Sequence, residues 1–224
     1  MKRKLVTFFA LGMAAMLPMA FGSTMPITPG GGAVSVPANG STFPGSLVAD
    51  TGVVALTPGL GSSITATGEE RVYLTSTGLD FFIQVTNNNQ TNGTDNLSLV
   101  DARNFAGFTT AVAYLTLPSG GVAPALASRA APGDTVNFYF VDSSGRNDLG
   151  SMAPSGLGNT SDWLEIDTNA TGLAFNGSIG VQDGGVASML AYSPVPEPTT
   201  TGVLCGAMAL IFIARRRAGG RRLS

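Results

Sequence analysis

The chain has 224 residues, and its twelve lysine and arginine residues against fourteen acidic residues give a net charge of −2 at pH 7. It contains no histidine, which excludes Ser-His-Asp and Cys-His catalysis and imidazole metal sites. All fourteen acidic residues lie between Asp50 and Glu197, where four arginines and no lysine leave a net charge of −10, and so acidic a segment excludes nucleic acid as a partner because nucleic acid binds basic faces.

The chain begins with the pattern of a secretory signal peptide. Basic residues at positions 2–4 precede an apolar run over residues 5–21, and Ala20 and Gly22 place small side chains where signal peptidase inspects them. The pattern predicts that signal peptidase cleaves between Gly22 and Ser23 and that the first 22 residues form a signal helix. An uncleaved anchor helix is the alternative.

The part between the signal peptide and the C-terminal tail has the pattern of a β-rich protein. Residues 23–46 are rich in Gly, Pro, Ser and Thr, and we expect a flexible leader or a loosely attached first strand there. Residues 47–193, the body, contain short runs of β-branched and aromatic residues separated by glycine and asparagine. This pattern predicts an all-β fold, an antiparallel β-sandwich of jelly-roll-like or Ig-like type.

The expected strands are short and the turns between them are rich in glycine. No stretch of ten or more residues in the body has the periodicity of a helix. The expected strands lie at residues 71–75, 81–86, 111–117, 135–141, 163–166, 172–175, 178–181 and 186–192, with turns at 92–93, 132–133, 144–145, 176–177 and 183–185.

Carboxylates are the remaining candidates for chemistry, because the body has no lysine for a Ser-Lys dyad or a Schiff base. The triplet Asp50-Thr51-Gly52 matches that of aspartic proteases, in which two such aspartates share one proton. A second triplet is needed for that chemistry, and the sequence has none. A turn at the end of a strand is therefore the favoured interpretation.

A second group of acids lies around residue 165. Asp162, Glu165 and Asp167 could include the pair of carboxyl groups that a glycosidase uses. On one strand Glu165 and Asp167 share a face, and we expect both to face solvent, opposite Leu164 and Ile166. Catalysis is therefore not the favoured interpretation of this group.

Two further features have plain structural interpretations. Residues 142–148 place acidic and hydroxyl side chains around a glycine, as a calcium loop does, but they lack the closing glutamate and contain Arg146. An ordinary hairpin loop is favoured there, and Trp163 is expected to be a buried anchor of the core rather than a sugar-stacking residue. We therefore expect no catalytic residue, no bound metal and no cofactor.

The last thirty residues combine three features in a fixed order. Three prolines disfavour helix and hold the first part extended. An apolar run over residues 202–214 follows, and it contains Cys205, the single cysteine of the chain, so no disulfide is expected in the body. The motif consists of Val195, Pro196, Glu197 and Pro198, and the basic end, residues 215–222, contains Arg215, Arg216, Arg217, Arg221 and Arg222.

The apolar run is a marginal membrane span. As a helix, residues 202–214 would be about 20 Å long, and adding residues 199–201 gives about 24 Å, short of the roughly 30 Å hydrocarbon core. Basic residues beside a transmembrane segment stay cytoplasmic, so the arginines would act as the stop signal. The pattern predicts a short transmembrane helix at about residues 199–214 that anchors the chain temporarily.

The tail, residues 194–222, resembles the PEP-CTERM sorting domain of exported proteins of Gram-negative bacteria. The motif, the apolar run and the terminal arginines carry the resemblance. In that family an exosortase, a membrane-embedded, cysteine-dependent transpeptidase-like enzyme, recognises the tail and removes it near the Pro-Glu-Pro. The resemblance implies that Pro196, Glu197 and Pro198 are what such an enzyme reads. A plain membrane anchor with a proline-rich stalk is the alternative.

The resemblance implies an exported surface or extracellular-matrix protein that is not an enzyme. Its body would lie in the periplasm while the tail holds it in the inner membrane, and processing would release it to the cell surface or outside the cell. Members of the family tend to come from bacteria that make exopolysaccharide, so a link to exopolysaccharide or biofilm is implied. The alternatives are a carbohydrate-binding module or carboxylate-dependent glycosidase on a β-sandwich, and a permanently membrane-anchored surface protein.

Overall fold

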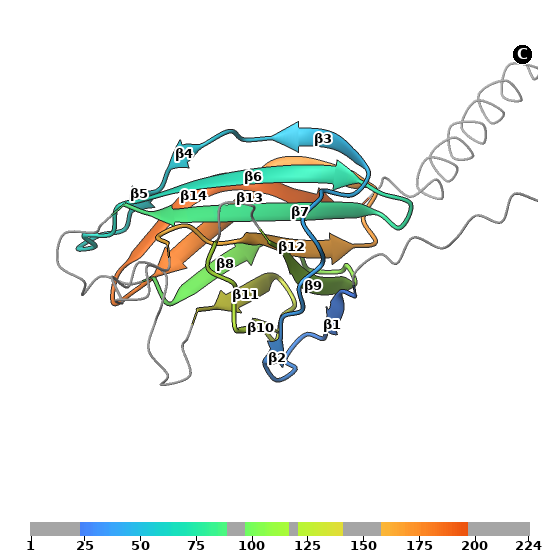
Figure 1. Ribbon diagram of the computed structural model, residues 1–224, viewed down its shortest axis with the longest axis horizontal. Helices are drawn as coiled ribbons and strands as arrows, with labels where there is room; N and C mark the ends of the chain where they lie inside the picture. Colours follow the sequence, from blue (N-terminus) through green and yellow to red (C-terminus); the bar gives the residue numbers. More distant parts are fainter. Residues whose placement is uncertain (1–22, 89–96, 117–120, 141–157, 197–224) are drawn as a thin grey trace, which may run out of the picture.

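The computed structural model describes residues 23–88, 97–116, 121–140 and 158–196. These residues form two sheets in which neighbouring strands are antiparallel, and they contain no helix (Figure 1). The prediction of an all-β fold is thereby confirmed. The expected signal helix, residues 1–22, and the expected transmembrane helix, residues 199–214, lie outside the described residues.

The first sheet, sheet A, has its long strands at the centre and short strands at its edges. Its order is β1-β9-β12-β7-β6-β3, and β4 also pairs with β6. The strands are β1 (Met25–Ile27), β9 (Thr110–Leu115), β12 (Trp163–Thr168), β7 (Leu79–Asn87), β6 (Ala66–Leu74), β3 (Ser46–Asp50) and β4 (Val54–Ala55).

The second sheet, sheet B, has its two longest strands, β13 and β14, next to the short edge strand β5. Its order is β2-β10-β11-β8-β13-β14-β5. The strands are β2 (Val34–Ser35), β10 (Leu126–Arg129), β11 (Thr135–Tyr139), β8 (Leu99–Arg103), β13 (Gly172–Gln182), β14 (Val186–Val195) and β5 (Thr57–Pro58).

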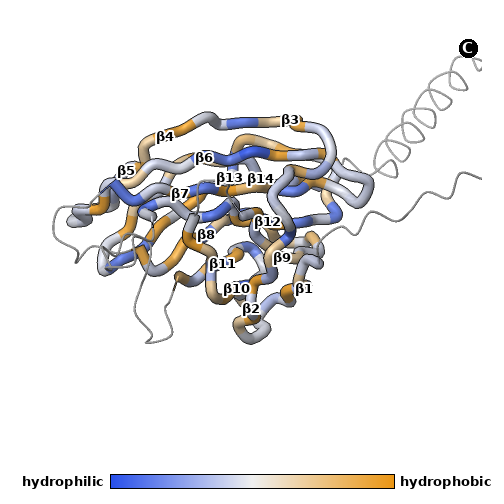
Figure 2. Tube along the Cα trace, in the orientation of Figure 1, coloured by the Kyte–Doolittle hydropathy of each residue, from blue (hydrophilic) through white to orange (hydrophobic). Residues whose placement is uncertain are grey.

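The two sheets share one hydrophobic core. Successive side chains of a strand point to opposite faces, and Figure 2 shows hydrophobic and hydrophilic stretches following one another along the long strands. The inward residues of both sheets are buried in a single cluster, which accounts for the stability of a fold without disulfides. Its largest members include Phe81, Ile83, Phe105, Phe138, Leu164, Ile166 and Ile179.

Sheet A is also covered on its outer face. The chain between β2 and β3 runs along the edge of β9. There the backbone amide of Asn39 donates to the carbonyl of Tyr114 at 2.8 Å, and the backbone amide of Thr116 donates to the carbonyl of Gly40 at 2.9 Å. It then crosses in front of the sheet towards β3 (Figure 1). We call residues 36–45 the crossing segment. Because it lies over the sheet, outward side chains of β7 and β12 are shielded from water.

A small aromatic cluster lies under the crossing segment. The Phe43 ring stacks on Tyr73 with centroids 4.9 Å apart and meets the ring of Trp163 edge-on at 5.2 Å. Phe82 and Leu115 complete the cluster, and such ring contacts contribute about 1 kcal/mol each beyond their buried area. Trp163 is 5 % exposed, so the prediction of a buried anchor is confirmed, although it packs outside the main core.

Residues 23–46, expected to be a flexible leader or a loosely attached first strand, contain two paired strands. β1 pairs with β9 and β2 pairs with β10, and Ile27 and Val36 are buried in the main core. The polar composition of this segment hid two short edge strands, because β1 buries only one of its residues and β2 buries none. The core-forming part of the chain therefore starts near Met25 rather than at residue 47.

Most of the other expected strands are present, with two corrections. The expected turn at residues 176–177 is wrong, because β13 runs through it with an irregularity between Ala174 and Gly177 in its pairing with β14. The sequence prediction also missed β3, β4, β5, β8 and β10, which are all short. By contrast, the expected turn at residues 183–185 connects β13 and β14, and Gly184 there has a φ of 63°.

The C-terminal end of the fold reaches the expected sorting tail. β14 continues to Val195, and Pro194 and Val195 pair with Leu173 and Gly172 of β13. The body therefore ends two residues later than expected. Pro194 has no amide hydrogen and cannot donate a hydrogen bond to a further strand.

The integration of β1 can be tested with a matched pair of substitutions. Ile27 is 5 % exposed and Met25 is 41 % exposed on the same strand. We expect Ile27→Ala to lower the free energy of unfolding by about 2–3 kcal/mol, as loss of a buried aliphatic side chain does, and Met25→Ala to change it by less than about 0.5 kcal/mol. Urea denaturation of residues 23–196 measures both, and an Ile27→Ala effect as small as that of Met25→Ala would mean that β1 is not part of the folded core.

Candidate functional site

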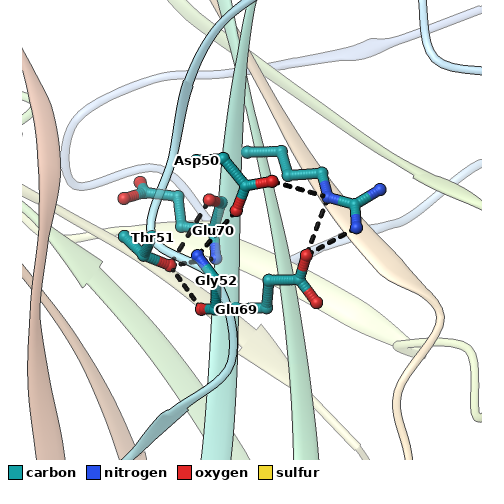
Figure 3. Close-up of polar contacts among 6 residues, drawn as sticks. Asp50, Thr51, Gly52, Glu69 and Glu70 are labelled. Carbon is teal, nitrogen blue, oxygen red and sulfur yellow. Dashed lines mark hydrogen bonds and ion pairs between the residues drawn. The ribbon is translucent and has the colours of Figure 1, made fainter.

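The Asp50-Thr51-Gly52 triplet forms a turn beside β6 (Figure 3). One carboxylate oxygen of Asp50 accepts the amide hydrogen of Gly52 at 2.7 Å, and the other lies 3.5 Å from Nε of Arg71. The hydroxyl oxygen of Thr51 accepts a hydrogen bond from the amide of Glu70 at 2.9 Å. The side chains of Asp50 and Thr51 are thus engaged by the turn and by β6, which agrees with the favoured interpretation, and among the described residues no second aspartate contacts Asp50.

Arg71 is held between acids and aromatic rings. Its Nη2 lies 2.6 Å from Oε1 of Glu69, and its guanidinium lies over the rings of Trp163 and Phe43, at 4.9 and 5.6 Å from their centroids. A cation in this position gains from the electron-rich ring faces. Arg71 is therefore engaged by Glu69, Asp50 and the aromatic cluster.

A group of three carboxyls lies on the outer face of sheet A, beneath the crossing segment. The pairing of β12 with β7 places Asp167 directly opposite Asp80, and Glu165 lies two residues earlier on β12 and so on the same face. These three acids come from neighbouring strands of the sheet. The sheet register therefore brings together residues that are 85 or more positions apart in the chain.

The expectation that Glu165 and Asp167 face solvent is wrong for Glu165. Both lie on the face opposite Leu164 and Ile166, as expected, but Glu165 is 2 % exposed. The physical reason is the crossing segment, from which the side-chain amide of Asn39 donates a hydrogen bond to Oε2 of Glu165 at 2.7 Å. The strand alternation was correct, and the cover over that face could not be seen in the sequence of β12.

Burial keeps these carboxyls protonated to unusually high pH. Loss of hydration raises the pKa of Asp80 to about 8, with further contributions from the nearby Asp167 and Glu165. Burial likewise raises the pKa of Glu165 to about 7, against the hydrogen bond from Asn39. The pKa of Asp167 is also raised by burial, and a hydrogen bond with Asp80 opposes that shift. Asp80 and Asp167 thus face each other as a proton-sharing pair.

The three carboxyls line a cavity of about 250 Å³. Its other lining residues are polar or small: Thr24, Asn39, Pro44, Thr75, Ser76 and Thr77. Asp80 is 5 % exposed, and within the described residues its Oδ1 has no hydrogen-bond partner. A buried carboxyl oxygen without a donor is uncommon and costly. We call this cavity the acid pocket.

The remaining acid of the predicted group lies elsewhere. Asp162 is buried just before β12, and its amide donates to the carbonyl of Val122 at 3.0 Å. It is not among the residues that line the acid pocket. The structure therefore brings Glu165 and Asp167 together with Asp80, which the sequence prediction missed. The only signal for Asp80 was an acid inside the otherwise apolar run of residues 79–83.

A further buried acid lies between the sheets. Glu70 is 1 % exposed, and its Oε2 accepts the amide hydrogen of Tyr192 at 2.6 Å. β5 pairs with β14 only at Ala187 and Ser188. The backbone amide of Tyr192 lies beyond that pairing, and Glu70 accepts its hydrogen bond in place of a neighbouring strand. Burial raises the pKa of Glu70 to about 8.

The remaining predicted residues fall mostly outside the described part of the chain. Val195 ends β14, Pro196 is the last described residue at that end, and Ser23 is the first at the other. In the described ranges no group of three or more acids or cysteines could hold a metal ion, and no helix there could cross a membrane. Ala20, Gly22, the loop at 142–148, Glu197, Pro198 and the five C-terminal arginines lie outside those ranges.

Comparison with known proteins adds no relative. The chain matches no family model, no curated protein and no solved structure.

The raised pKa values predict that stability falls as pH rises. Unfolded carboxyls have pKa values near 4, whereas Glu165, Asp80 and Glu70 keep their protons to about pH 7 or 8 in the folded chain. The folded state therefore binds more protons between pH 4 and 8, and its stability is lost progressively over that window. We expect Tm to fall by at least about 10 °C from pH 5.5 to 8.5, since each of these groups loses up to about 1.4 kcal/mol per pH unit below its folded pKa and about 1 kcal/mol shifts Tm by about 3 °C in a domain of this size.

Calorimetry at a series of pH values measures this dependence. We expect Asp80→Asn to reduce the loss of Tm, because a neutral amide does not titrate. A Tm that stays constant or rises between pH 5.5 and 8.5 would show that these carboxyls titrate normally.

Proposed function

We propose that the chain is an exported protein whose C-terminal tail directs its sorting in the manner of PEP-CTERM proteins. Signal peptidase would remove residues 1–22, and the tail would hold the body in the inner membrane. An exosortase-type enzyme would then read Pro196, Glu197 and Pro198 and separate the body from the tail. The product is a surface or extracellular-matrix protein associated with exopolysaccharide or biofilm.

The observation that carries this proposal is the position of the motif directly after the last strand. β14 ends at Val195, and Pro196-Glu197-Pro198 follow without a spacer, ahead of the apolar run and the arginines. A cut near this motif would leave all strands described between Met25 and Val195 in one piece. Such a cut would release a folded body rather than a fragment.

For the body, we propose a jelly-roll-like sandwich rather than an Ig-like one. Along the chain, successive elements change sheet repeatedly: β7 lies in sheet A, β8 in sheet B, β9 in sheet A, β10 and β11 in sheet B, and β12 in sheet A. Frequent crossing between two sheets is typical of jelly rolls.

The acid pocket favours a second candidate for the body, the binding of carbohydrate. The pocket combines carboxyls, an amide and hydroxyls around about 250 Å³, and polar groups of this kind bind sugar hydroxyls. Asp80 and Asp167 are hydrogen-bonded to each other, closer than the roughly 5 Å or more that separates the catalytic carboxyls of glycosidases. We therefore propose binding rather than hydrolysis.

The sorting proposal predicts the fate of a variant in which Pro196, Glu197 and Pro198 are replaced by alanine. We expect the variant to stay full-length after the signal peptide and to remain in the membrane fraction of the native host, because the processing enzyme no longer recognises its tail. Immunoblotting and intact mass of membranes and medium measure the outcome.

The control variant replaces the neighbouring Thr199, Thr200 and Thr201 with alanine, which keeps the motif and the apolar character of the segment. We expect this control to be released as the wild type is. Equal release of the motif variant and the wild type would reject recognition of the motif.

A further inference from the structure

The acid pocket accepts hydrogen bonds and carries no positive charge on its lining residues. Asp80, Glu165 and Asp167 provide carboxyl oxygens, and Thr75, Ser76 and Thr77 provide hydroxyls. Asn39 uses its amide nitrogen to donate to Glu165. Its volume of about 250 Å³ is below the roughly 300–1,000 Å³ of sites for drug-sized ligands, so it would suit a small ligand.

The buried Oδ1 of Asp80 marks what the pocket lacks. Asp80 lines the cavity and is only 5 % exposed. Within the described residues its Oδ1 has no hydrogen-bond partner. Carboxylates accept hydrogen bonds and attract positive charge. A ligand that brings both a donor and a positive charge would satisfy this atom and offset the repulsion that arises between the three acids when they ionise.

The residues around the acid pocket do not supply a positively charged donor for Asp80. Tyr73 lies opposite Asp80 on β6, and Ala111 and Ala113 lie opposite Asp167 and Glu165 on β9. Arg71, one row further along β6, is already engaged by Glu69 and Asp50. The crossing segment contributes Asn39, which has no charge.

We propose that the acid pocket binds the protonated amine of a small hydroxylated ligand, such as an amino sugar. This inference rests on the carbohydrate-binding role proposed for the body and is independent of the sorting tail. An ammonium group has three donors and one charge, which match the three carboxyls. The hydroxyls at residues 75–77 lie at the same cavity and would bind the hydroxyl groups of the ligand.

Binding of an ammonium would displace protons from the carboxyls. At pH 7 Asp80 holds its proton, since its pKa is raised to about 8, and Glu165 is partly protonated at a pKa of about 7. A bound positive charge favours the ionised carboxylates. Amine binding would thus release about one proton. Below the pKa of the carboxyl that ionises, the affinity of the pocket for the ammonium group would rise by up to about tenfold per pH unit.

Titration calorimetry of the full chain in detergent, at pH 6, 7 and 8, tests the proposal with two probes. Glucosamine carries a protonated amine, and N-acetylglucosamine is the matched neutral sugar. We expect glucosamine to bind at least about tenfold more tightly, to gain at least about fivefold in affinity from pH 6 to 7, and to release a proton that is measurable in buffers of different ionisation enthalpy.

Variants locate the binding. Asp80→Asn and Glu165→Gln should each weaken glucosamine binding by at least about tenfold, and Asp183→Asn, on the hairpin turn of sheet B, should not change it. In the wild-type protein, glucosamine should shift the amide NMR signals of residues 75–77 and of Asp167. This second measurement does not depend on the folding of a variant, and shifts confined to other residues would overturn the proposal.

The remaining outcomes distinguish the proposal of an ammonium site from the proposal of carbohydrate binding. Equal binding of both sugars at this pocket would overturn the amine while leaving carbohydrate binding in place. No binding of either sugar at pH 7, where the amine of glucosamine is still mostly protonated, would overturn both. Calcium binding that Asp80→Asn abolishes, without glucosamine binding, would replace the amine with a metal ion and overturn the proposal.

Discussion

The burial of β7 on both of its faces is the constraint on which the rest of the structure depends. Its inward residues, Phe81 and Ile83 among them, form the core between the sheets, while Phe82 packs outward against the aromatic cluster. A strand covered on only one side would expose its outward face to water. Here the crossing segment covers that face, and its short pairings with β9 hold it in place.

This cover explains why acids of ordinary type behave unusually. Asp80 and Glu165 occupy outward positions that would be hydrated on an open sheet, and the crossing segment removes that hydration. Desolvation is the largest cause of both raised pKa values, so the neutral forms are favoured in the folded chain. The acid pocket is thus a consequence of the same packing that buries Trp163 and Phe82, and its chemistry depends on the position of the crossing segment.

The sequence allowed the class of the fold to be predicted, because strand alternation is local: residues 81–86 and 163–166 were recognised from their own pattern. It did not reveal the roles of Ile27, Asn39 and Phe43, whose contacts are with strands 30 to 130 positions away and leave no local signal. The same reason explains why the acid pocket was predicted only in part. Glu165 and Asp167 were assigned to the correct face, but Asp80 is their neighbour only through the pairing of β12 with β7. The Pro-Glu-Pro motif needed no folding to be recognised, because it is contiguous.

The central claim is that the crossing segment buries the outer face of sheet A and keeps its carboxyls protonated near neutral pH. The most direct test is a pH titration of the side-chain carboxyl ¹³C signals of Asp80 and Glu165 by NMR, with Asp183 followed in the same spectra. We expect midpoints of about 8 for Asp80 and about 7 for Glu165. Midpoints near 4 for both residues, as in an unfolded chain, would contradict the claim and with it the acid pocket.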